Sequence, residues 1–152
     1  MGLLERVAKK TESVTIGPMP KLKDHTRDSM TECIASFFAA SEKLKSVDFG
    51  KYIENNKEAL TMLSSLKQSE SVSSIEHLKI YNKDVEISEE LVEEHAQFFE
   101  ITSALKNLDT AGKDMKASSV AILLTALSQS ESFINFESIP EIPYRLYSSS
   151  EV

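Results

Sequence analysis

Apolar residues recur at helical spacing through the middle of the chain, and the four prolines lie outside this region. The prolines stand at positions 18, 20, 140 and 143, so residues 21–139 contain no helix-breaking ring. No internal repeat is evident. The apolar spacing predicts an all-α fold, an antiparallel bundle of four or five helices. The expected helices cover residues 24–46, 49–68, 71–81 (the weakest pattern), 88–108 and 110–130.

Three of these segments carry more specific signals. In residues 24–46, Met30, Cys33, Ile34 and Phe37 share one arc of the helix, so this arc is expected to face the core and to bury the thiol. Ser88 is the expected N-cap of the fourth helix. The run "VAILLTAL" at 120–127 is apolar nearly all round, which predicts a helix at the middle of the bundle.

Two apolar arms flank the predicted bundle. The first ten residues place Leu3, Leu4 and Val7 on one face, and "TESVTIGPMP" resembles an extended linker. The last residues mix aromatic and aliphatic side chains with two prolines, so an extended C-terminal tail is expected. The predicted organisation is therefore an N-terminal arm and linker at 1–20, a helical bundle domain at 21–133 and a tail at 134–152.

The arms are the predicted partner-binding segments, because their apolar faces need something to pack on. A helix of about ten residues is too short to be stable alone. It could cap its own bundle, dock on another subunit, or touch lipid through Arg6, Lys9 and Lys10. The short length of this segment favours docking on a protein over attachment to lipid. In a homodimer, the second subunit would cover its apolar face. The predicted partner-binding residues are Leu3, Leu4, Val7, Tyr144, Leu146 and Tyr147.

The acidic stretch "EELVEEHAQFFE" at 89–100 is the strongest candidate for chemistry. On a helical wheel, His95 falls within the apolar stripe, whereas most of the neighbouring glutamates fall on the opposite side. His95 is therefore interpreted as a hydrogen-bonded core or interface histidine, and the glutamates as a solvated face. Glu90 and Glu94 share a face at four-residue spacing and could hold a cation loosely.

Other catalytic signatures are missing from the sequence. Only 4 glycines are present, so neither a phosphate-binding loop nor a dinucleotide fingerprint can be assembled. No histidine has a glutamate three residues before it, as a di-iron bundle requires, and no G-x-S-x-G motif occurs. We therefore expect no catalytic residue, no metal site and no cofactor. The alternative is a metal-binding helical-bundle enzyme that uses Glu90, Glu94 or His95 with carboxylates from another helix.

The net charge and the number of cysteines limit which classes of partner and which cellular compartment are expected. The formal net charge of -7 disfavours nucleic acid, and acidic residues dilute the basic content of residues 21–45, where a helix-turn-helix would have to lie. The single cysteine favours a reducing compartment, so a cytoplasmic protein is expected. We see no secretory signal and no apolar run long enough to span a membrane. The sequence thus predicts a small acidic adaptor, chaperone or assembly factor that binds another protein and is not an enzyme.

Overall fold

The chain folds as short strands that alternate with longer helices. The computed structural model describes residues 2–19, 21–80, 87–109 and 116–130. The strands are β1 (Ser13–Thr15), β2 (Ser46–Asp48), β3 (His77–Lys79) and β4 (Asn107–Asp109). The helices are α1 (Leu3–Lys10), α2 (Asp24–Ala40), α3 (Asn56–Gln68), the 3₁₀ turn η1 (Glu70–Ser73), α4 (Glu89–Ile101) and α5 (Ala117–Gln129).

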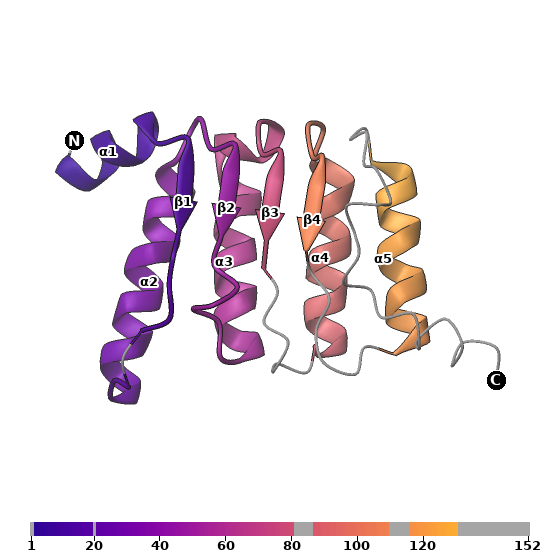
Figure 1. Cartoon of the computed structure of the whole chain (residues 1–152), viewed down its shortest axis with the longest axis horizontal. Helices are drawn as coiled ribbons and strands as arrows, with labels where there is room; N and C mark the ends of the chain where they lie inside the picture. The colour runs from indigo at the N-terminus through magenta and orange to yellow at the C-terminus, as the bar shows by residue number, and fades with distance from the viewer. Residues whose placement is uncertain (1, 20, 81–86, 110–115, 131–152) are drawn as a thin grey trace.

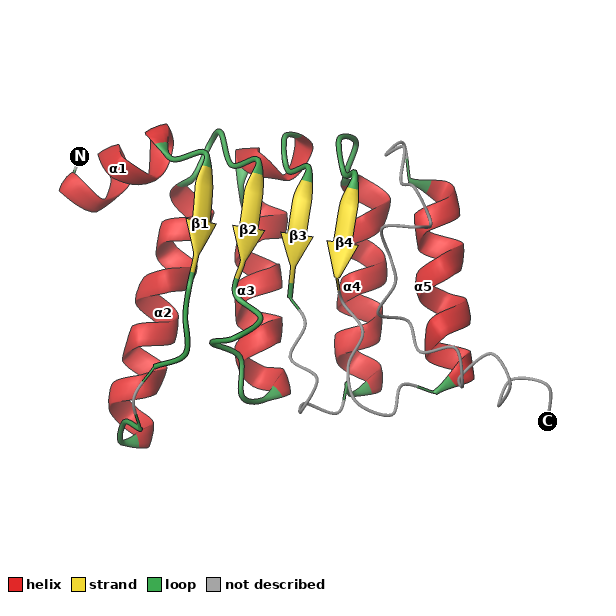
Figure 2. Cartoon of the chain, in the orientation of Figure 1, coloured by secondary structure: helices red, strands yellow, loops and turns green. Residues whose placement is uncertain are grey.

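The architecture is α/β, and the predicted all-α antiparallel bundle is wrong. The four strands form one parallel sheet in the order β1-β2-β3-β4. Helices α2 to α5 stand in a row behind one face of this sheet, and α1 lies apart at its N-terminal end (Figures 1 and 2). Helices α2, α3 and α4 each return the chain to the start of the next parallel strand, so these three helices run parallel to one another.

The molecule is built from one structural unit that recurs, although the sequence shows no evident repeat. Ser13, Ser46, His77 and Asn107 occupy equivalent positions in successive strands, so the units are 33, 31 and 30 residues long. Extensive helix contacts join neighbours in the row, α2 with α3, α3 with α4 and α4 with α5. An arrangement of stacked strand–helix units with neighbour contacts is a solenoid.

Two ladders of apolar side chains connect the sheet to the helices. The central residue of each strand forms the first ladder, in which Val47, Leu78 and Leu108 are buried and Val14, on the edge strand, is half-buried. The second ladder lies three residues earlier and consists of the buried residues Leu44, Ile75 and Leu105. Together with the helix side chains, these residues make one continuous core.

This three-residue spacing explains why the expected helices extend beyond the ends of the helices in the structure. Apolar residues three apart also mark one face of a helix, so each strand imitated a further helical turn. The helices expected to reach residues 46 and 108 end at Ala40 and Ile101, and the two strands follow. The helix expected over residues 71–81 is a short 3₁₀ turn followed by β3.

Hydroxyl side chains mark the end of every described helix. The C-cap residues of the five described α-helices, all with extended backbone, are Thr11, Ser41, Ser69, Thr102 and Ser130. Oγ of Ser69 donates a hydrogen bond to the Ser41 carbonyl at 2.7 Å, and Oγ of Ser130 donates to the Thr102 carbonyl at 2.9 Å. These bonds satisfy carbonyls that a helix end leaves free and tie consecutive units together.

The N-terminal ends of two α-helices, α3 and α4, are capped by side chains. Ser88 accepts a hydrogen bond from the Leu91 N–H at 3.2 Å, which confirms the predicted N-cap of α4. Asn55 accepts one from the Glu58 N–H at 2.9 Å.

No helix in the described part of the chain is long and apolar enough to pass through a membrane.

Candidate functional site

His95 is a core histidine, as the wheel geometry predicts. Its side chain is 2% exposed, and its Nδ1 donates a hydrogen bond to the Leu91 carbonyl at 2.8 Å. The imidazole also meets the Phe99 ring edge-on, with 5.8 Å between the ring centres. Burial lowers the pKa of His95 from 6.5 to about 4, so the ring is neutral at physiological pH. These contacts give His95 a structural role.

The glutamates around His95 do not converge with it. Glu89, Glu90, Glu93 and Glu100 are exposed on the other side of α4. Glu94 instead pairs with Lys67 on α3, with 2.9 Å between Oε1 and Nζ. Across the ranges that the structure describes, no cluster of three or more His, Cys, Asp or Glu side chains could hold a metal ion. The geometry of these residues thus offers no ligand set for the metal-binding alternative.

Arg27 and Glu58 form a buried ion pair that joins α2 to α3. The guanidinium donates two hydrogen bonds to the Glu58 carboxylate, from Nε at 2.5 Å and from Nη2 at 3.1 Å. Nη2 also donates to the Tyr52 carbonyl, and the guanidinium carbon lies 4.5 Å from the centre of the Tyr52 ring. The hydrogen bond to Glu58 raises the pKa of Arg27. Because both oxygens of the Glu58 carboxylate accept hydrogen bonds from the guanidinium, we interpret this pair as a link between helices.

The charged side chains where the strands begin also pair with one another. Nζ of Lys45 lies 3.4 Å from Oε1 of Glu12, and Nζ of Lys106 lies 2.9 Å from Oε1 of Glu76. Within the strands, the Asn107 side-chain amide donates a hydrogen bond to His77 Nδ1 at 2.5 Å. These contacts pair polar groups of neighbouring strands with one another.

The apolar face of α1 lies open at the N-terminal end of the row. Leu3 is 70% exposed, Leu4 is 46% exposed and Val7 is 48% exposed, whereas Ala8 is fully buried against the body. Lys9 anchors the helix through Glu42, with 3.6 Å between Nζ and Oε1. The other predicted partner-binding residues, Tyr144, Leu146 and Tyr147, lie outside the described part of the chain, as does the predicted tail at 134–152.

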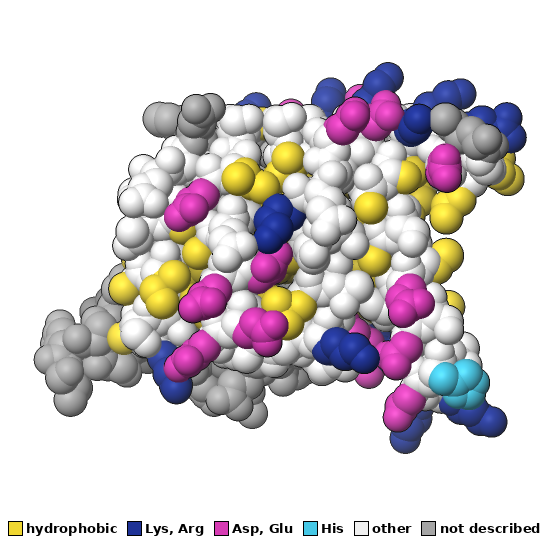
Figure 3. All heavy atoms as spheres, turned by 180° about the vertical axis from the view of Figure 1, so that it is seen from behind, with side chains coloured by type: hydrophobic (Ala, Val, Ile, Leu, Met, Phe, Trp, Pro, Cys, Tyr) yellow, Lys and Arg dark blue, Asp and Glu magenta, His cyan; other side chains and the backbone are white. Residues whose placement is uncertain are grey.

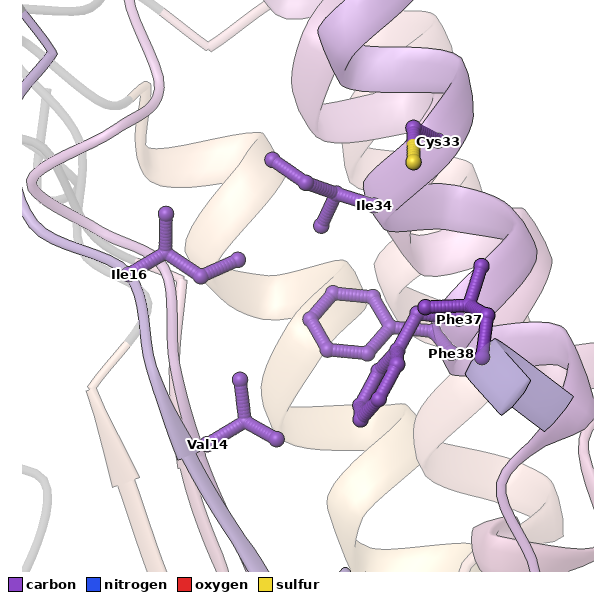
Figure 4. A pocket seen from close by; sticks show the side chains of 7 residues that line it. Val14, Ile16, Cys33, Ile34, Phe37 and Phe38 are labelled. Atoms are coloured by element: carbon purple, nitrogen blue, oxygen red, sulfur yellow. The ribbon is translucent and has the colours of Figure 1, made fainter. Parts of the chain in front are cut away.

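Beside α1 lies a pocket with apolar walls, which we call the N-terminal pocket. It has a volume of about 260 Å³. Figure 4 shows Val14 and Ile16 facing Ile34 and the two phenylalanine rings across the opening. The lining side chains are Leu4 from α1, Val14 and Ile16 from β1 and the segment after it, and Cys33, Ile34, Phe37 and Phe38 from α2. Among them, Phe38 is fully buried.

The sequence assigned the wrong face of α2 to the core. The side chains of α2 that are buried in the body are Arg27, Thr31, Ala35 and Phe38. The arc expected to be buried is instead the half-buried outer side, and the Cys33 thiol is exposed. The missed signal is that α2 carries two apolar stripes, one interrupted by polar residues that pair inside the core. A helix with two apolar sides needs neighbours on both.

The end of the row explains why this surface is open. β1 is the edge strand of the sheet, so only its β2 side is paired within the sheet. α3 contacts the inner side of α2, and the next helix outward, α1, lies across the end of the row (Figure 1).

No protein-family model matches the chain, and the search of curated proteins gave no significant match.

Proposed function

We propose that this protein is a non-enzymatic protein-binding module, an adaptor, chaperone or assembly factor of the cytoplasm. Its binding surface consists of Leu3, Leu4 and Val7 together with the N-terminal pocket, and we call this the N-terminal surface. The observation that carries the proposal is the high exposure of these three α1 side chains beside a pocket with apolar walls. Large exposed apolar patches on soluble domains mark interaction sites.

Solenoid architecture supports the same proposal. The end units of solenoids carry a polar outer face when they end in solvent. Here the outer side of α2 presents Met30, Ile34 and Phe37, which are only half-buried. Water contact with such side chains costs roughly 25 cal/mol per Å² of apolar area, so a protein that covers them gains that free energy. The exposed free thiol of Cys33 fits a reducing compartment.

The test is a comparison of two matched double variants in full-length protein. Leu4→Ser with Val7→Ser removes the exposed apolar side chains of α1. Ile101→Ser with Ile122→Ser removes two side chains of similar exposure, 46% and 44%, on α4 and α5. Partners captured by the natural protein are identified by mass spectrometry, purified and titrated against all three proteins.

The first variant is expected to lose affinity at least about tenfold, which corresponds to 1.4 kcal/mol, and the second to keep it. Equal losses in both variants would contradict the proposed surface. A homodimer through the same surface is the alternative, and it would bring two Cys33 thiols near the shared interface. Sedimentation and oxidative cross-linking of Cys33 distinguish a self-associating chain from one that binds a different protein.

A further inference from the structure

The outer side of α2 has the spacing of a helix-binding stripe. Met30, Cys33, Ile34 and Phe37 stand at i, i+3, i+4 and i+7, the positions through which one helix contacts another. Met30, Ile34 and Phe37 are half-buried and Cys33 is exposed, so the stripe is accessible. The opposite side of α2 packs on α3. The stripe therefore offers the contact pattern of a second helical neighbour.

The geometry of the row provides the place for such a helix. Within the described row, α3 and α4 each pack between two other helices, and α2 packs against α3 on its inner side. α1 lies across the end of the row and not alongside α2 (Figure 1). A helix standing beside α2 would cover the stripe next to Leu4, which lines the N-terminal pocket. It would repeat the side-by-side packing already present between α2 and α3.

Basic side chains lie at both ends of this place. Arg6 and Lys10 are exposed on α1, and the exposed Lys23 is the N-cap residue of α2 at the other end of the stripe. Of the carboxylates in the described ranges, none lies within salt-bridge distance of these three cations. The acidic side chains of α2, Asp24, Asp28 and Glu32, point away from the stripe on a helical wheel.

Figure 3 shows how the charges are distributed on the helical side of the molecule. Acidic side chains spread over the face of the row, whereas the end around α1 carries basic side chains with a few acidic ones among them and apolar ones beside them. On α1 itself Arg6, Lys9 and Lys10 outnumber Glu5. The net charge of the whole chain is -7, but the local charge that a partner meets at α1 is different. A twofold pairing of this end with itself would bring like charges together, which disfavours a second copy as the occupant.

We infer that the N-terminal surface binds an acidic amphipathic helix of another protein, which lies alongside α2 and places carboxylates near Arg6, Lys10 and Lys23. The inference rests on the proposed function and specifies the chemistry of the partner. Apolar residues of that helix would contact Ile34 and Phe37, and its carboxylates would set its orientation.

Two synthetic helical peptides of about 18 residues serve as probes, a length comparable to that of α2. Both carry leucine at i, i+3, i+4 and i+7, and the remaining positions are mostly glutamate in one peptide and mostly lysine in the other. Cys33 is the single cysteine of the chain, so the rate of its reaction with N-ethylmaleimide reports occupancy of the stripe. The glutamate peptide is expected to slow this reaction and to bind at least about tenfold more tightly than the lysine peptide.

A matched pair of charge variants tests the basic residues. Arg6→Ser with Lys10→Ser is expected to reduce affinity for the glutamate peptide about fivefold or more, and added salt should weaken binding less in this variant. Lys51→Ser with Lys57→Ser removes two exposed cations elsewhere and should leave binding unchanged. Circular dichroism and unfolding midpoints of both variants establish that they fold.

Several outcomes would overturn the inference. Equal protection of Cys33 by both peptides, or by neither, would reject an acidic helical partner. Disulfide-linked dimers through Cys33 would assign the stripe to a second copy. Binding to phosphatidylserine vesicles that depends on Leu4 and Val7 would assign it to lipid. If partner capture depends on Leu4 and Val7 but the glutamate peptide does not bind, the proposed function stands and only the partner chemistry is wrong.

Discussion

Arg27 on α2 and Glu58 on α3 form a two-point ion pair inside the core, 31 residues apart in sequence. Glu58 is 3% exposed and Arg27 is 9% exposed, so water contributes little to the solvation of either charge. Each therefore depends on the other, since an unpaired buried charge is costly. The Glu58 carboxylate also accepts the Glu54 N–H at 2.9 Å, which fixes the chain that leads into α3.

Replacement of Glu58 by glutamine should therefore destabilise the fold strongly. The change leaves the Arg27 charge without its buried counter-ion, and we expect a loss of about 3 kcal/mol. Glu54→Gln is the matched control, because Glu54 approaches the same guanidinium at 3.5 Å but is 63% exposed. The control should lose less than about 1 kcal/mol. Urea unfolding measures both, and equal losses would mean that burial of the pair is unimportant.

Stability should fall as the pH drops below 6.5, because of His95. The folded protein holds the pKa of His95 at about 4, whereas the unfolded chain takes up the proton near 6.5. The unfolded state therefore binds more protons between these values, and about 3 kcal/mol is lost by pH 4. His95→Leu should flatten this part of the curve, measured by urea unfolding at steps of pH. Phe99→Leu, which disturbs the same core and keeps the imidazole, should lower stability without changing the slope.

Ser71→Ala should destabilise the turn after α3. The Ser71 hydroxyl is buried, accepts the Leu44 N–H at 3.1 Å and donates to Ser41 Oγ at 2.9 Å. Its removal leaves a buried N–H without a partner, which costs about 1 to 3 kcal/mol. Ser73 lies on the same turn but is exposed, with a long 3.4 Å hydrogen bond, so Ser73→Ala should be close to neutral. A similar thermal midpoint for both variants would contradict the role of Ser71.

The first ladder allows the same substitution, valine to alanine, to be compared at a buried position and at a half-buried one. Val47 and Val14 are direct partners in the sheet, but Val47 is 1% exposed whereas Val14 on the edge strand is half-buried. Val47→Ala should cost about 2 kcal/mol, and Val14→Ala should cost about half as much. Chemical denaturation gives both values. If Val14→Ala proves the more damaging, the assignment of β1 as the open edge of the sheet is wrong.

Periodicity located four of the five expected helices and none of the strands. The helical stretches within 24–46, 49–68 and 88–108 exist, because their apolar stripes extend over several turns. The strands have three residues each and bury one central side chain, which is too short for an alternating pattern. A strand of this length is specified by its neighbours in the sheet, and their register is not visible along the chain.

The sequence places Leu3, Leu4 and Val7 on one face of α1, and the structure leaves these side chains exposed; their role in partner binding stays a prediction. The buried position of His95 followed correctly from its place on the wheel. The outer stripe of α2 was mistaken for the core face. Arg27 and Thr31 are polar, so their burial depends on Glu58 and Tyr52, residues that only the fold brings near. Their side of α2 therefore looks solvent-facing in sequence, and the apolar outer side looks internal.

Units that chiefly contact their neighbours give the chain a modular length. Equivalent strand positions are separated by 33, 31 and 30 residues, so small insertions are absorbed in the connections without disturbing the sheet. Duplication of one strand–helix segment would lengthen the row by one step and keep both ends intact. The N-terminal surface and the number of units can therefore change independently of each other, because the surface lies at one end of the row and the number of units is set by its interior.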